Sequence, residues 1–241
     1  YMVTYFISSS ANGLYTAASK IPNFVILFSQ IFIDAWQLSA VDEYDQEGGR
    51  QFFTKVFRVY SGGIFAVASV LILLCQFITK ILVAKSYYDS WQFVPILIIA
   101  TTFSCIVNFL ASIYMAEKKN VMSLVTAMSG AITNFVLNLV FIPRIGANGA
   151  ALATVCAFLV VFVTRAIDTR RFIKIDFKLP VLLGETAVLV TQSILLLKYD
   201  GTLWVYIIEV LLVVVMLLLN LKPIKELVNL ILAKFLKKRK N

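Results

Sequence analysis

Long apolar runs separated by short polar breaks dominate the chain. Seven of these runs, if helical, are long enough or almost long enough to cross about 30 Å of hydrocarbon. They are Ile21–Ala40, Val56–Ile78, Phe93–Ala116, Val121–Ile142, Gly149–Ile167, Val181–Leu197 and Leu203–Leu219. A shorter apolar stub, Met2–Ser8, precedes them. The pattern predicts an all-α, polytopic membrane protein, a bundle of about seven complete transmembrane helices plus a partial one.

The same pattern divides the chain into three parts. We expect residues 1–13 to be the end of a truncated transmembrane helix with an outer turn, and residues 14–220 to be a helix bundle. Pro22 is expected to interrupt a helix that would otherwise run on from about Leu14. Residues 221–241 form a basic tail whose apolar residues share one helical face, which is typical of a helix in a membrane interface.

Composition agrees with a membrane protein and argues against several classes of chemistry. The chain is 60% hydrophobic and 15% charged, with a mean hydropathy of +0.88, whereas soluble domains are nearer half apolar and a quarter charged. It has no histidine, and its three cysteines lie far apart inside apolar runs. The sequence therefore predicts no cofactor, no metal site and no enzyme.

Positive charge is shared unevenly between the polar breaks. If the tail is cytoplasmic, the alternation of the breaks places most of the 22 Lys and Arg residues on that side. The other side keeps only Lys20, Lys80, Lys85, Arg144 and Lys198. Because cytoplasmic loops carry excess positive charge, we expect a multi-pass protein of the cytoplasmic membrane with a cytoplasmic C-terminus. A basic tail directly after a span favours membrane lipids over nucleic acid as its partner.

One face of the first span is polar along most of its length. It carries Lys20, Asn23, Gln30, Asp34 and Gln37, which fall within about a 100° arc of a helix. Asp34 lies roughly 20 Å into the membrane at the helical rise, where a carboxylate needs water or a partner. Two interpretations stay open: the face lines a water-filled substrate cavity, or it belongs to a hydrogen-bonded cluster between helices.

Two other spans carry weaker polar stripes. Asn108 in the third span and Asn134 in the fourth are further candidates for the cavity, although small and hydroxyl residues around them favour helix packing. In the last spans, Glu209 and Gln192 come to similar depth and are expected to form a hydrogen bond. Asp34 and Glu209 are the candidate residues for coupling to an ion, H⁺ or Na⁺.

Two acidic residues lie near the cytoplasmic ends of their predicted spans. Asp168 and Glu185 are both close to Arg or Lys in the sequence. We expect both carboxylates to be solvated.

The stretch FIPRIGANGAALAT, from Phe141 to Thr154, predicts a tight helical hairpin. Pro143 is expected to end the fourth span, because proline cannot continue a helix. The small residues that follow would let the fifth span approach a neighbour closely. The residues predicted to serve this packing are Gly146, Gly149, Ala150 and Ala151.

This hairpin, with Asn138 upstream, closely resembles the signature of the polysaccharide-export flippases in the multidrug/oligosaccharidyl-lipid/polysaccharide exporter superfamily. GLYTAASKIPN followed by IFIDAWQLSA resembles the start of that family's C-terminal lobe. The resemblance implies one lobe of a two-lobe transporter, with the N-terminal lobe of the same protein as its partner. It also implies flipping of undecaprenyl-pyrophosphate-linked oligosaccharide, the repeat unit of O-antigen, capsule or exopolysaccharide, across the bacterial cytoplasmic membrane by alternating access.

Two other function classes compete with this hypothesis. A cation-coupled multidrug exporter of the same superfamily would rely on intramembrane carboxylates such as Asp34 and Glu209. A membrane-embedded enzyme of polysaccharide assembly would need long external loops with Arg or His chemistry, and the external loops here are short.

Overall fold

The computed structural model describes residues 2–43, 49–222 and 225, and the side chains of these residues outside 35–49. Its elements are α1 (Met2–Phe6), α2 (Ser9–Ala18), α3 (Asn23–Glu43), α4 (Gly49–Leu82), η1 (Lys85–Phe93), α5 (Val94–Ala116), α6 (Asn120–Ile145), α7 (Ala147–Asp168), η2 (Thr169–Arg171), α8 (Leu179–Lys198) and α9 (Leu203–Leu219). Within the part of the chain that the structure describes, each of the seven predicted apolar runs is helical, except that the first begins with Ile21 and Pro22 in the turn before α3.

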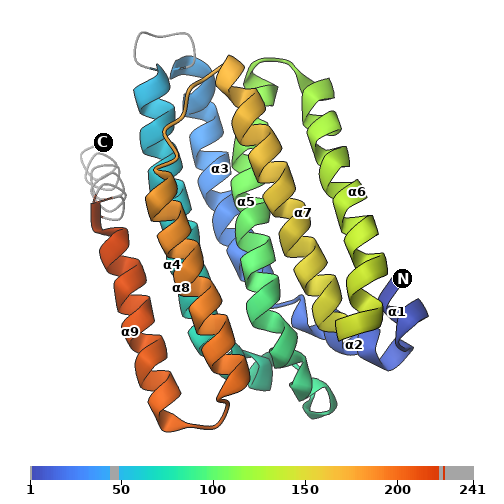
Figure 1. The fold of residues 1–241 in the computed structure, drawn as a ribbon. Helices are drawn as coiled ribbons and strands as arrows, with labels where there is room; N and C mark the ends of the chain where they lie inside the picture. Colours follow the sequence, from blue (N-terminus) through green and yellow to red (C-terminus); the bar gives the residue numbers. More distant parts are fainter. Residues whose placement is uncertain (1, 44–48, 223–224, 226–241) are drawn as a thin grey trace, which may run out of the picture.

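The helices α3 to α9 run side by side as one bundle, and α2 lies across the end where α6 and α7 meet (Figure 1). In the described part of the chain, five helices are long and apolar enough to cross a membrane, or six if the bent pair of α2 and α3 counts as one span. The 17-residue α9 is shorter than that. The described residues therefore supply five or six spans by length and composition, rather than the seven complete spans expected.

The chain breaks at Pro22, as predicted. Helix α2 ends at Ala18 and α3 begins at Asn23, with the two axes bent by 41°. At the other end of α2, the Ser8 side chain accepts a hydrogen bond of 3.1 Å from the Ala11 N–H and so caps the helix. The apolar stub before it is the five-residue α1.

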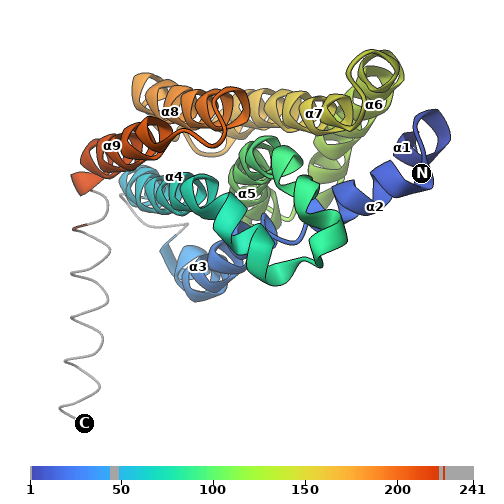
Figure 2. The ribbon, with the colours of Figure 1, turned by 90° about the horizontal axis from the view of Figure 1, so that it is seen from below.

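Helix α5 is the centre of the bundle. It packs against α3, α4 and α7, which surround it in the view along the helices (Figure 2). Aromatic rings bind these helices together: Tyr60 stacks on Phe109 with ring centroids 5.1 Å apart, and Phe57 meets Phe109 edge-on at 5.5 Å. Most of α5 is buried for this reason, whereas α6 exposes a long apolar face.

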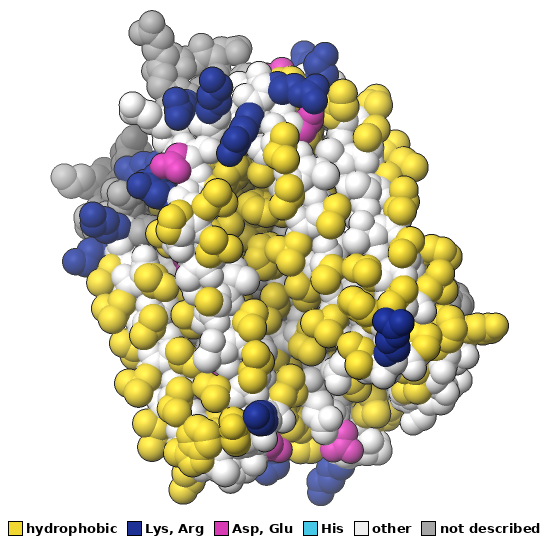
Figure 3. Space-filling view, viewed as in Figure 1, with side chains coloured by type: hydrophobic (Ala, Val, Ile, Leu, Met, Phe, Trp, Pro, Cys, Tyr) yellow, Lys and Arg dark blue, Asp and Glu magenta, His cyan; other side chains and the backbone are white. Residues whose placement is uncertain are grey.

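Basic side chains gather at one end of the bundle, and apolar side chains cover most of the surface below them (Figure 3). This is the end that holds the start of α4, the turn between α5 and α6, and the connector between α7 and α8 (Figure 1). The arrangement matches a bundle that spans a bilayer with an unequal distribution of Lys and Arg between its two ends.

The α6–α7 hairpin is as tight as the sequence suggests, but α6 does not stop at Pro143. It continues through Arg144 to Ile145, because a proline in the last turn removes only one hydrogen bond. Gly146 then turns the chain with a φ of +64°, a conformation that glycine adopts readily. A Cβ on Gly149 would lie 2.5 Å from the Phe141 carbonyl oxygen, so the two backbones touch there.

Candidate functional site

One face of α3 is fastened to the bundle. The Ser29 hydroxyl lies 2.6 Å from the Tyr60 hydroxyl on α4, and Tyr60 donates to the Cys105 carbonyl on α5 at 2.9 Å. Val25, one turn away from Ser29, is fully buried. These contacts fix the rotation of α3 about its axis and so determine which side chains point away from the bundle.

The opposite face of α3 carries the predicted polar stripe, together with Lys20 in the turn before the helix. Lys20, Asn23, Gln30 and Asp34 are all exposed. The first three line a shallow hollow of about 360 Å³ together with Phe24, Ile26 and Leu27. Among the described residues, none of the four polar side chains has a hydrogen-bond or ion-pair partner. Within the described part of the chain, these four residues are therefore not part of a buried cluster. Gln37, the fifth predicted member, lies outside the described side chains.

Of the two asparagines predicted to face a cavity, the structure exposes Asn108 and packs Asn134. Asn108 is an exposed residue on the mostly buried α5, and no described residue pairs with it. Asn134 instead donates to Thr154 on α7 at 3.3 Å and accepts from Asn138 at 2.8 Å. Asn134 does not face a cavity as predicted, because the close contact between α6 and α7 places Thr154 opposite its side chain.

The remaining residues of the α6 stripe also face α7. Gly130 lies against the Val161 side chain with no room for a Cβ. Farther along the helix, Ser123 and Thr126 hold the Arg165 guanidinium of α7. The stripe is thus a helix-packing surface.

Arg165 is a buried residue that the sequence analysis placed among the cytoplasmic cations. It is only 4% exposed. Its guanidinium donates to the Val107 carbonyl at 2.7 Å, the Thr126 hydroxyl at 3.0 Å and the Ser123 carbonyl at 3.1 Å. Arg165 follows Phe162 by about one helical turn, so the two side chains share a face of α7. This spacing could have indicated from the sequence that Arg165 is buried. Arg165 joins α5, α6 and α7 and does not line the exposed polar face.

A second polar cluster is buried between α4, α8 and α9. Gln192 donates to Glu209 at 2.8 Å, which is the predicted hydrogen bond, and accepts from Ser69 at 2.8 Å. Gln192 and Glu209 are both 0% exposed. The candidate coupling residue Glu209 therefore lies inside the lobe, apart from the α3 face that carries Asp34.

Asp168 and Glu185, which were expected to be solvated, both have partners within the bundle. Glu185 is only 2% exposed, because α8 packs against α4 with this residue turned inward, where it contacts the Asn220 amide. Asp168 accepts from the Tyr114 hydroxyl at 2.9 Å and pairs with Arg171 at 2.9 Å. The distance of a residue from the end of its own helix, which is what the sequence gives, does not indicate these partners on other segments.

The described residues define the membrane-embedded lobe of a helical protein with one exposed polar face. Across the described ranges, no group of three or more Cys, Asp or Glu residues could hold a metal ion. A scan against protein-family models and a search of curated proteins found no match.

Among solved structures, the chain is similar to the lipid II flippase MurJ in an inward closed conformation, with a TM-score of 0.60 and 16% sequence identity. The match covers 94% of this chain and 50% of the flippase, so the chain spans half the length of that protein. The chain therefore shares the fold of half of that flippase.

Proposed function

We propose that the chain is one lobe of a flippase that moves undecaprenyl-pyrophosphate-linked oligosaccharide across the bacterial cytoplasmic membrane. The observation that carries the proposal is the polar face of α3, exposed and without partners among the described residues, on a membrane helix of a fold shared with a lipid II flippase. Polar residues that face hydrocarbon are costly, so this face needs an aqueous path or a second lobe opposite it.

In this proposal the α3 face and Asn108 of α5 line one wall of a central cavity. Lys20, near the end of the bundle opposite the basic end, would attract the anionic pyrophosphate. Asn23 and Gln30 would hydrogen-bond sugar hydroxyls. Rocking of this lobe against the N-terminal lobe would expose the cavity to each side in turn. The basic end would be cytoplasmic, as the distribution of Lys and Arg favours.

A cation-coupled multidrug exporter is the second candidate, and Asp34 is the observation that favours it. Asp34 is an exposed carboxylate at membrane depth with no cationic partner among the described residues. Such a group can exchange H⁺ or Na⁺ with water in a cavity.

Transport by the full-length protein in proteoliposomes tests both candidates. Lipid-linked oligosaccharide placed in the inner leaflet should become accessible to an external lectin that cannot cross the membrane. Lys20→Ala should slow this transport, whereas Lys80→Ala, which removes an exposed cation of α4 near the same end, should not. A protein that moves no glycolipid but confers drug resistance on cells lacking their own exporters would be the exporter instead.

A further inference from the structure

A groove of about 1140 Å³ opens at the basic end of the bundle, between the start of α4, the α7–α8 connector, the start of α8 and the end of α9. None of the described residues that line this groove belongs to α3 or α5, and none of them is Lys20, Asn23, Gln30 or Asp34. Gly62 helps to form it, because the missing side chain lets Asn220, just after α9, lie directly against α4.

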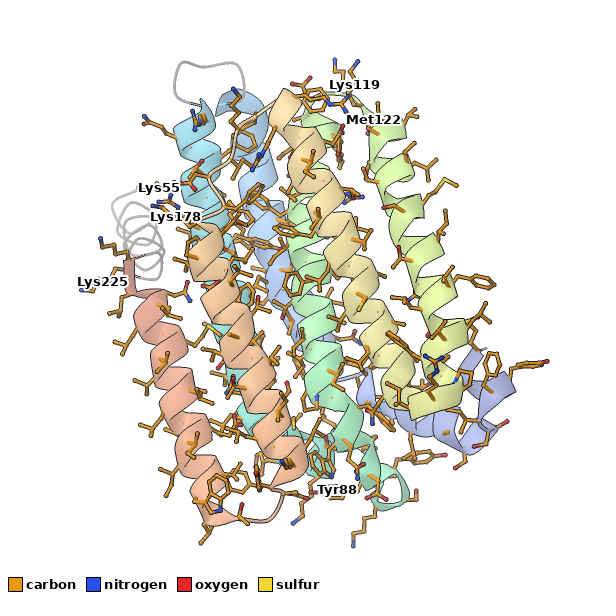
Figure 4. All side chains as sticks on the ribbon, in the orientation of Figure 1. Lys55, Tyr88, Lys119, Met122, Lys178 and Lys225 are labelled. Carbon is orange, nitrogen blue, oxygen red and sulfur yellow. The ribbon has the colours of Figure 1, made fainter. Side chains whose placement is uncertain are left out.

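The mouth of the groove is strongly basic. Among the described residues that line it, six are cationic and two are acidic: Arg50, Lys55, Arg58, Lys178, Lys222 and Lys225, against Asp176 and Glu185. In Figure 4, Lys55 and Lys178 lie beside one another, with Lys225 nearby. The Arg50 Nε donates to the Lys174 carbonyl at 2.9 Å, which holds this guanidinium at the rim.

The two acidic residues do not balance this charge. Asp176 is already engaged, since it pairs with Arg58 at 2.7 Å and accepts from the Lys178 backbone N–H at 3.1 Å. The Lys178 N–H and the Arg58 guanidinium hold the pKa of the Asp176 carboxyl below its usual value, so Asp176 is ionised at neutral pH. Glu185 is buried on the floor of the groove. Within the described part of the chain, Lys222 and Lys225 have no acidic partner.

Part of the groove's wall is apolar. This part includes Val59 on α4, Val181 and Leu182 on α8, and Leu218 and Leu219 on α9. Val181, Leu218 and Leu219 are exposed. A soluble anion would use only the cations at the mouth, whereas a phospholipid would use both parts: its phosphate at the mouth and the upper part of an acyl chain along the wall. Basic pockets between membrane helices on the cytoplasmic side bind anionic headgroups in this way.

We propose that this groove binds the headgroup of an anionic glycerophospholipid, such as phosphatidylglycerol. The ligand is a resident lipid of the membrane and not the transported glycolipid. The site does not depend on the proposed transport activity, since it uses different helices from the α3 face.

Native mass spectrometry of the full-length protein in detergent, titrated with phosphatidylglycerol, measures the affinity. The variant Lys222→Gln/Lys225→Gln removes two exposed cations that have no described partners, so folding should be retained. We expect its apparent Kd to rise about thirtyfold, which corresponds to about 1 kcal/mol for each lost cation. The matched control is Lys119→Gln/Arg170→Gln, which removes two exposed cations at the same end but outside the groove.

The control and three further probes decide between the outcomes. Equal loss of affinity in the control variant would mean general surface electrostatics and would overturn the site. Phosphatidylcholine with the same acyl chains should bind at least tenfold more weakly, and equal binding would also overturn it. Inorganic phosphate that displaces the lipid at comparable concentration would show a site for free anions. Dihexanoyl phosphatidylglycerol should bind more weakly, and if it does not, the apolar wall takes no part.

Discussion

A buried set and an exposed set of polar side chains within the membrane-spanning helices differ in how the fold satisfies them. Ser69, Gln192 and Glu209 are buried between three helices and hydrogen-bonded to one another. Gln30 and Asp34 on α3 are exposed and have no partner among the described residues. The first set stabilises the lobe, whereas the second set needs something outside the lobe.

The difference lies in the neighbours and not in the residue types. Both sets combine an amide with a carboxylate at membrane depth, and each cluster could be read from the sequence as structural or as functional. What decides is whether another helix of the same lobe covers the face.

The largest effect is expected from Gly149→Leu. The added side chain meets the α6 backbone at the Phe141 carbonyl, which cannot move aside easily. We expect a loss of about 3 kcal/mol of stability, at the upper end for overpacking, measured as a lower Tm of the full-length protein in detergent. Gly184→Leu is the control, since a Cβ there has its nearest neighbour at 4.0 Å. If both variants are as stable as the parent, the hairpin is not closely packed.

Gln192→Leu should cost about 2 kcal/mol, because it leaves the buried Ser69 hydroxyl and the Glu209 carboxyl without their partner. Combining it with Glu209→Leu should recover part of the loss, since apolar replacement of both partners leaves only the Ser69 hydroxyl unsatisfied. Thermal unfolding of the two single variants and the double variant measures the coupling. Strictly additive losses would mean that Gln192 and Glu209 do not interact.

Asn134→Ala should cost about 0.6 kcal/mol, the typical value of a hydrogen bond between membrane helices, because it removes the contact with Thr154. Transport should stay near the parent rate. If the Tm is unchanged but transport is strongly reduced, Asn134 lines the cavity and does not serve helix packing.

Asp34→Asn should have the smallest effect on stability, within about 0.5 kcal/mol, because the side chain is exposed and makes no described contact. Its transport rate reports separately on whether the charge orients substrate or couples an ion. A Tm loss as large as that of Gln192→Leu would show that Asp34 is a buried acceptor in the whole protein.

The sequence predicted much of the fold because membrane helices are defined by long apolar runs. Helix α5 ends at Ala116 and α9 covers Leu203–Leu219, both as expected, and the break at Pro22 is in place. Local rules were sufficient for these features, since a proline or an apolar run acts on its own segment.

The burial of single polar residues could not be predicted in the same way. Arg165 is buried because carbonyls of α5 and α6 happen to lie opposite it, and Glu185 is buried because α8 packs on α4. Periodicity along one helix gives the face of a residue but not what covers that face. For the same reason, the sequence alone could not decide whether Asp34 and Asn134 line a cavity or take part in contacts between helices.

We propose that the α3 face lines a water-filled path in the whole protein, and cysteine accessibility tests this proposal most directly. Gln30→Cys and Gln192→Cys are introduced separately into full-length protein that lacks Cys75, Cys105 and Cys156, and are exposed to a small hydrophilic thiol reagent in membranes. The account predicts rapid labelling at position 30 and protection at position 192. Protection at position 30 in every conformational state, with the protein folded, would contradict it.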